Sequence, residues 1–98
     1  MTSCCYILHS VKLGKFYIGS TLAFTERLIK HNSAAFGSNK FTSAVSDWEE
    51  FLVINCSSIE QARSIERHIK NMKSKIYINN LNRYLEMVKK LLSVYSNL

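Results

Sequence analysis

The chain has 98 residues, a formal net charge of +6 and a hydrophobic share of 47%, which excludes an intrinsically disordered tail. Its length leaves room for one domain of ordinary size with one modest core. No apolar run approaches the roughly 18 residues of a membrane span. Because residues 1–6 also lack the regions of a signal peptide, we expect a cytoplasmic protein with no membrane partner.

Two counts narrow the class of protein. The 13 lysines and arginines against 7 acidic residues suit a polyanionic partner such as nucleic acid, although solubility accounts for this charge equally well. Residues 59–98 hold eight of the basic and three of the acidic side chains. The three cysteines form no CxxC pair, so we expect free thiols and no zinc knuckle.

The chain begins with the pattern of a β-hairpin. Residues 4–9 and 15–18 are short and rich in β-branched and aromatic side chains, and the five residues between them include a glycine. Helical spacing follows over residues 22–32, with Thr21 as the expected N-cap. The expected apolar stripe of this helix consists of Leu22, Leu28 and Ile29.

The middle of the chain predicts a loop, a strand and a helix. Residues 33–47 are small and polar, which indicates an irregular loop with room for one short helical turn. Residues 48–55 carry an apolar run and predict a third strand. The pattern over residues 59–72 predicts a helix, for which the N-cap candidates are Ser57 and Ser58 and the capping-box partners Glu60 and Gln61.

Two shorter segments complete the chain. Residues 77–84 predict a short helix or turn, and residues 83–95 a final amphipathic helix. One side of that last helix carries Met87, Val88, Leu91 and Leu92. The order is therefore β-β-α-β-α-α. We expect a single α+β domain over residues 1–98, a small three-stranded antiparallel sheet flanked by helices.

One carboxylate lies in an awkward position. Around the helix 59–72, Glu66 falls between Ile59 and Ala62, at the edge of the apolar stripe. A carboxylate there must be paired, hydrogen-bonded or bound to a cation. Considered alone, this helix favours an ion pair with Arg63 or Lys70 at contact spacing.

Further polar and aromatic residues gather in the first third of the chain. Arg27 and His31 are four residues apart and share one side of their helix. Arginine holds phosphate with a fork of donors and histidine can move a proton, although this helix alone favours two solvated side chains. Tyr6 and Tyr17 lie on the hairpin strands, where tyrosines usually pack, and Gly19 permits a tight turn or a close backbone approach.

Taken together, these features make the sequence of residues 6–32 resemble the GIY-YIG nuclease superfamily. The Tyr-Ile-Gly triplet at 17–19 is identical to the second signature of the family. Tyr6 occupies the position of the tyrosine that ends the first signature, and the glycine of that signature is missing here. Arg27 follows ten residues after the tyrosine of the triplet, and His31 follows four residues later, as in many members.

The resemblance extends over nearly the whole chain. Glu66 takes the place of the family's metal-binding glutamate, and Asn80 is the best candidate for its downstream asparagine, with Asn79 beside it. The chain is most similar to the compact bacterial branch, which includes the excision-repair nuclease domain and Slx-like domains. The resemblance implies the GIY-YIG endonuclease fold.

The resemblance also implies a metal-dependent DNA endonuclease that hydrolyses phosphodiester bonds, directed by DNA structure or weakly by sequence, in repair or recombination. Its cofactor would be Mg²⁺, with Mn²⁺ as a substitute and Glu66 as the one side-chain ligand. Arg27 would bind the scissile phosphate. The general base stays open among Tyr6, Tyr17 and His31, and Asn80 would position one of these groups.

The substrate would be duplex or branched DNA, held by the basic half of the chain. The expected phosphate contacts are Arg63, Arg67, Lys70 and Lys73, each of which is about as well explained by a solvated helical face. Since the chain carries no recognition module, target choice would come from DNA shape or a targeting protein partner. The alternative function is a non-catalytic nucleic-acid-binding module with the same fold; a plain interaction domain is the third.

Overall fold

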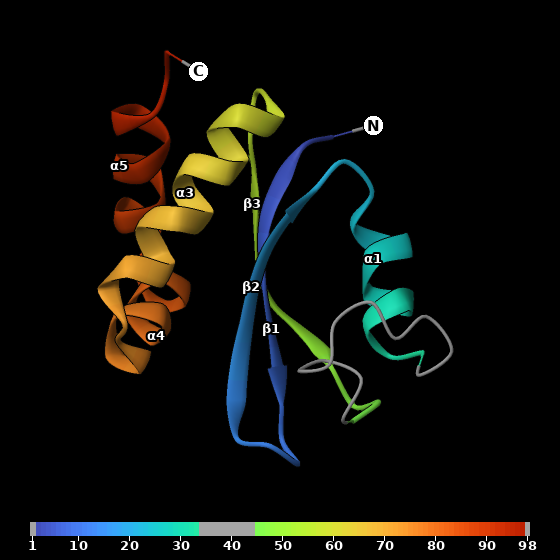
Figure 1. Cartoon of the computed structure of the whole chain (residues 1–98). Helices are drawn as coiled ribbons and strands as arrows, with labels where there is room; N and C mark the ends of the chain where they lie inside the picture. Colours follow the sequence, from blue (N-terminus) through green and yellow to red (C-terminus); the bar gives the residue numbers. More distant parts are fainter. Residues whose placement is uncertain (1, 34–44, 98) are drawn as a thin grey trace.

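The computed structural model describes residues 2–33 and 45–97 and confirms an α+β fold. Strands β1, β2 and β3 form an antiparallel sheet in the order β2-β1-β3. The elements in chain order are β1 (Cys4–Ser10), β2 (Lys15–Thr21), α1 (Phe24–His31), β3 (Glu49–Asn55), α3 (Ile59–Met72), α4 (Lys75–Arg83) and α5 (Leu85–Val94) (Figure 1).

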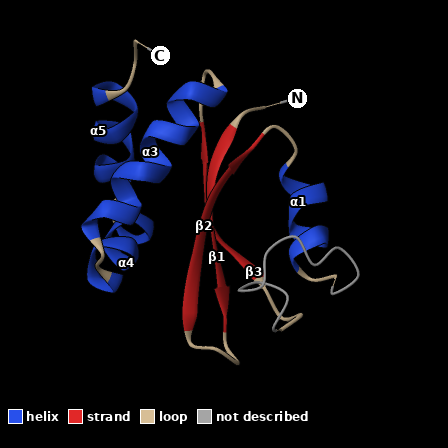
Figure 2. Ribbon diagram, viewed as in Figure 1, coloured by secondary structure: helices blue, strands red, loops and turns tan. Residues whose placement is uncertain are grey.

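The sheet is the middle of three layers. Figure 2 shows α1 on one face of the sheet and α3, α4 and α5 on the other. Side chains alternate along central strand β1, so it feeds both faces: Cys5 and Ile7 enter the core beneath α3, whereas Tyr6 and Leu8 enter the core beneath α1. Strand β2, at the edge of the sheet, contributes to both cores with partly buried side chains.

The hairpin turn is tighter than the sequence indicates, because β1 extends to Ser10; at the other end of the hairpin, β2 continues to Thr21. Gly14 has a positive φ of 61° and its N–H donates to the Ser10 carbonyl at 2.8 Å, which closes the turn. The buried Ser10 hydroxyl donates to the Asp47 carboxylate at 2.6 Å, and that carboxylate also accepts the N–H of Lys12. The hairpin tip is thereby joined to the segment that leads into β3.

The expected N-cap of the first helix is wrong. Thr21 still belongs to β2, where it pairs with Cys4, and its Oγ1 accepts the N–H of Ala23 instead of a helical amide. The helix therefore begins only at Phe24, after the chain has left the sheet, and Ala23 gives it no side-chain cap.

The expected apolar stripe of α1 is also largely wrong. Leu22 and Ile29 are exposed, at 48% and 61%, and only Leu28 of the expected stripe packs toward the sheet. The inward face consists instead of Phe24, Leu28 and His31, which follow one another at helical intervals of four and three residues. Because the helix begins at Phe24, Leu22 lies outside it, and the side of the helix that meets the sheet differs from the predicted one.

The capping signals of α3 are confirmed. The Ser58 hydroxyl accepts the N–H of Gln61 at 3.1 Å, and the Gln61 side-chain oxygen accepts the N–H of Ser57 at 2.7 Å. The helix ends at Lys73, whose φ of 49° lies in the left-handed region and turns the chain at once into α4.

The C-terminal segments form two helices. The region expected as a short helix or turn is helix α4, which begins two residues earlier because the Ser74 hydroxyl accepts the N–H of Tyr77. Extended Tyr84 separates it from α5, whose apolar side is confirmed, with Val88 and Leu91 buried. Within residues 2–33 and 45–97 the segment predicted as a short helix or turn is thus a helix, and the order reads β-β-α-β-α-α-α.

Two other expectations have different outcomes. All three cysteines are free, as expected. The short helical turn expected within residues 33–47 falls mostly on residues outside the described part of the chain. None of the helices in residues 2–33 and 45–97 has the length and apolar character that a membrane crossing requires.

Candidate active site

Three aromatic rings meet on the α1 face of the sheet. Tyr6, in the central strand, is 1% exposed, and its hydroxyl lies 2.9 Å from Nε2 of His31, the last residue of α1. The His31 ring lies 4.6 Å from that of Tyr17, centroid to centroid, and the two tyrosine rings are 6.3 Å apart. The fold thus brings together Tyr6, Tyr17 and His31, three side chains that are far apart in sequence and form an aromatic cluster.

Gly19 allows this arrangement. It pairs with Tyr6 in the register of β1 and β2. A Cβ atom at position 19 would lie only 2.5 Å from the hydroxyl oxygen of Tyr6 and 2.6 Å from its Cζ. The Tyr6 side chain can therefore extend across β2 only because position 19 carries no side chain, the close approach that the sequence indicated.

Burial controls the charges of this cluster. Burial, and with it the Arg27 guanidinium, which repels an imidazolium, lowers the pKa of His31 to about 4. Burial raises the pKa of Tyr6 to about 12, against the opposing effect of Arg27 near its hydroxyl. Near neutral pH the Tyr6–His31 hydrogen bond therefore joins two uncharged groups, with exposed Arg27 beside them.

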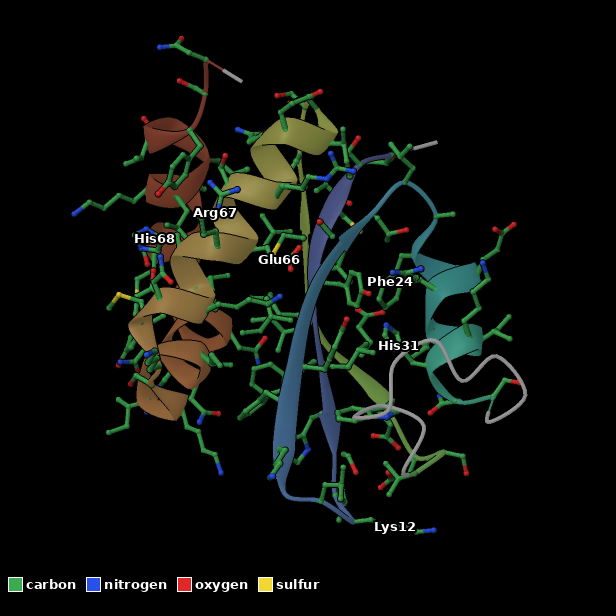
Figure 3. All side chains as sticks on the ribbon, viewed as in Figure 1. Lys12, Phe24, His31, Glu66, Arg67 and His68 are labelled. Carbon is green, nitrogen blue, oxygen red and sulfur yellow. The ribbon has the colours of Figure 1, made fainter. Side chains whose placement is uncertain are left out.

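Glu66 approaches from the opposite layer. Figure 3 shows its side chain between α3 and strand β2. The Ser20 hydroxyl donates to Oε1 at 2.7 Å, and the Lys70 ammonium forms an ion pair with Oε2 at 2.5 Å. The expectation that a cationic neighbour in α3 pairs with Glu66 is confirmed, and Lys70 is that partner.

An open groove of about 390 Å³ surrounds this carboxylate. Its lining places three cationic side chains around one carboxylate, a composition that suits an anionic ligand. The lining residues are Ser20, Arg63, Glu66, Arg67, Lys70 and Asn71. Three of the four expected phosphate contacts thus share one groove, and Lys73 lines a neighbouring hollow together with Lys70.

The aromatic cluster and the groove adjoin neighbouring residues of edge strand β2, one on each face of the sheet. Gly19 leaves room for the Tyr6 side chain on one face of the sheet, and the hydroxyl of the next residue, Ser20, donates to Glu66 on the other. The Glu66 carboxylate is near enough to Tyr6 to contribute to its raised pKa. One group bound at this edge, such as a backbone phosphate, could therefore face both sets of side chains.

Asn80 is the remaining residue expected at the site. It is a half-buried residue of α4, and its carbonyl accepts the N–H of Tyr84 near the end of that helix. Among residues 2–33 and 45–97, no hydrogen bond joins its side chain to Tyr6, His31 or Glu66. The positioning role expected of Asn80 therefore stays a prediction.

Two supporting residues were missed from the sequence. Ser20 anchors Glu66, and Asn32 binds the backbone of Trp48 in both directions, with Nδ2 donating at 2.9 Å and Oδ1 accepting at 2.7 Å. Trp48 in turn packs against Tyr17. An asparagine directly after a helical histidine was the available signal, because its amide can both donate to and accept from a backbone.

The site could hold a metal ion through one carboxylate. No group of three or more histidine, cysteine or acidic side chains gathers in the described part of the chain. Glu66 alone, in an open groove, fits a strongly hydrated ion such as Mg²⁺, which often takes one or two carboxylates and completes its shell with water and phosphate oxygens.

Comparison with known proteins gives one match. The model of a family described as the GIY-YIG catalytic domain matches residues 2–82, which include the aromatic cluster and the groove. No curated protein and no solved structure matches the chain significantly. The match confirms the resemblance seen in the sequence and covers most of the chain. This chain belongs to the GIY-YIG catalytic domain family.

Proposed function

We propose that this protein is a metal-dependent endonuclease that hydrolyses DNA phosphodiester bonds. The family is of nuclease type and its members generally depend on a divalent metal, which supports the proposal. The observation that carries it is that the aromatic cluster and the Glu66 groove adjoin neighbouring residues of edge strand β2. There, a phosphate could contact Arg27 and the cations of α3 together.

Glu66 would hold the metal ion, Mg²⁺ or Mn²⁺ in its place. When bound, the ion would neutralise charge on the phosphate and the leaving oxygen. Arg27, exposed beside the aromatic cluster, would bind the scissile phosphate and stabilise the charge that develops on it. Glu66, through the metal ion, and Arg27 would therefore both stabilise negative charge on the phosphate.

Proton transfer is assigned to the aromatic cluster. Tyr17 is more exposed than Tyr6, so we assign Tyr17 to orient the attacking water. The proton of this water would pass to one of Tyr6, Tyr17 and His31. The pKa of His31, about 4, disfavours His31 as that base, and its ring would instead hold Tyr6 in place by their hydrogen bond.

The groove favours recognition of DNA structure over DNA sequence. Arg63, Arg67 and Lys70 offer charge to phosphates flanking the cut, and phosphate contacts carry no base information. We therefore propose a structure-directed or weakly sequence-specific enzyme, suited to branched or flapped DNA of the kind found in repair and recombination. A targeting protein partner would add selectivity.

One observation favours a second candidate, a nucleic-acid-binding module with no catalysis. Lys70 neutralises Glu66 within the chain, which in such a module would be a permanent structural ion pair. The fold and the basic groove would be retained, and DNA would bind without being cut.

A cleavage assay separates the two functions. Labelled duplex, flap, branched and single-stranded DNA, with RNA included, would be incubated with Mg²⁺ or Mn²⁺, and EDTA should stop cleavage. Glu66→Ala and Arg27→Ala should each lower the rate at least about 100-fold. The matched controls, Glu86→Ala and Lys30→Ala, remove the same charges elsewhere on exposed helical positions and should leave the rate unchanged.

The outcomes are distinct. Circular dichroism and thermal unfolding would verify that each variant is folded. DNA binding without cleavage on every substrate would favour the non-catalytic module. Full activity in Glu66→Ala would contradict the metal-binding role of Glu66.

A further inference from the structure

Both oxygens of the Glu66 carboxylate are engaged within the chain. The Ser20 hydroxyl donates to Oε1 at 2.7 Å, and the Lys70 ammonium contacts Oε2 at 2.5 Å. Any cation that binds Glu66 must therefore share the carboxylate with both neighbours or displace one of them.

The two neighbours differ in their compatibility with a divalent cation. Ser20 is neutral and occupies one lone pair of Oε1, which leaves other acceptor sites on the carboxylate free. Lys70 carries a charge of the same sign as the metal and lies directly on Oε2. Coulomb repulsion disfavours an ammonium and a divalent cation on the same carboxylate, so Lys70 and the metal compete.

Lys70 can leave at little cost. Its side chain is 52% exposed and reaches Glu66 from one helical turn away, and exposed ion pairs of this spacing are weak. The other cations of the groove, Arg63 and Arg67, make this a favourable place for a phosphate, which offers Lys70 a second anionic partner.

We propose that Lys70 couples phosphate binding to metal binding. Lys70 neutralises Glu66 until a phosphodiester of the nucleic acid enters the groove; it then transfers to the phosphate and exposes Oε2 to the divalent cation. The proposal rests on the proposed function, because it takes Glu66 as the residue that holds the metal. Linkage requires that each ligand strengthens the binding of the other.

The first test measures Mn²⁺ affinity by titration calorimetry without DNA. Lys70→Met should bind Mn²⁺ about three- to tenfold more tightly than the unmodified protein, because the competing charge is gone. Lys89→Met, which removes the same charge from an exposed position on α5, should change the affinity less than about twofold. Lys70→Gln supplies a second neutral side chain if Lys70→Met fails to fold.

Glu66→Gln separates the failure of this proposal from that of the proposed function. If Glu66→Gln loses Mn²⁺ binding but Lys70→Met binds no more tightly than Lys89→Met, the competition by Lys70 is overturned and Glu66 stands as the metal residue. If Glu66→Gln binds Mn²⁺ as well as the unmodified protein, both proposals fail.

The second test is a double-mutant cycle on DNA affinity in EDTA, read by fluorescence anisotropy of a labelled duplex. Glu66→Gln should tighten binding about two- to fivefold, since it releases Lys70 and removes a negative charge. In the Lys70→Met background the same substitution should have a smaller effect. Equal effects in both backgrounds would overturn the transfer of Lys70 from Glu66 to phosphate.

Discussion

At the scale of single residues, the closest contact of the site is between Gly19 and Tyr6. The phenol ring of Tyr6 passes over a backbone position that has no room for a methyl group. The ring is buried, so it cannot swing into solvent to relieve a clash. The Tyr6–His31 hydrogen bond therefore depends on the residue at position 19.

We predict that Gly19→Ala lowers the free energy of unfolding by about 1–3 kcal/mol, because the added Cβ overpacks the Tyr6 ring. Urea unfolding would measure the loss. Nitrogen NMR of the His31 ring should show a weakened bond to Tyr6. Gly14→Ala is the control: it strains a positive φ in open space and should leave the His31 signal unchanged.

His31 gives stability a defined pH dependence. Its pKa is about 4 in the folded chain, against an ordinary value of 6.5. Between these values the unfolded chain binds a proton that the folded chain does not, so stability falls as the pH drops through this range. Above pH 6.5 both states are uncharged at this residue and its contribution is constant.

We predict that the titration of His31 lowers the free energy of unfolding by about 3 kcal/mol as the pH falls from neutral to 4. Urea unfolding at several pH values would be compared with that of His31→Gln, which lacks this titration but keeps a polar side chain. Identical pH profiles for the two proteins would contradict the buried, uncharged state of His31.

At the scale of elements, α1 is held to the sheet at its C-terminal end. Asn32, directly after the helix, binds both backbone polar groups of Trp48, just before β3. The same helix has no side-chain cap at its N-terminus. The position of His31 in the site therefore depends on these hydrogen bonds as well as on the packing of Phe24 and Leu28.

We predict that Asn32→Ala destabilises the protein by about 1–3 kcal/mol, since it removes both hydrogen bonds that Asn32 makes to the Trp48 backbone. Hydrogen exchange of the α1 amides should accelerate, and fluorescence of Trp48, the single tryptophan, should change. Asn79→Ala removes an exposed amide that bonds only within α4 and should change stability by less than about 0.5 kcal/mol. Equal losses in both variants would contradict this account.

Some elements follow from sequence because their signals are local. The start of α3 is set by Ser58 and Gln61, three residues apart, and their bonds form whatever the rest of the chain does. The start of α1 was misplaced because Thr21, a good cap by type, is already used by β2. Where a local capping preference competes with strand pairing, strand pairing determines the structure of the residue.

At the scale of the whole molecule, charge is divided between the layers. The groove cations lie on α3, on the opposite face of the sheet from α1 (Figure 1). Net positive charge would draw nucleic acid toward the protein, but only cations in direct contact with phosphates release counterions. The salt dependence of binding therefore reports which cations contact the DNA.

We predict that Arg63→Ala and Arg67→Ala each reduce the slope of log affinity against log salt by about 0.9. Anisotropy titrations of a labelled duplex over a series of KCl concentrations, in EDTA, would measure it. Lys30→Ala removes the same charge from α1 and should leave the slope unchanged. A comparable reduction in Lys30→Ala would place the DNA elsewhere.

The sequence by itself determined the α+β class, the hairpin, the capped helix α3 and the spacing of the family signature, all of which depend on neighbouring residues. Only the tertiary structure decided that His31 is buried beside Tyr6 and that Ser20 donates to Glu66. These contacts depend on which faces meet across the sheet: Tyr6 and His31 are 25 residues apart, and Ser20 and Glu66 are 46 apart. Periodicity gives each element an inward face, but strand order and packing determine what that face contacts.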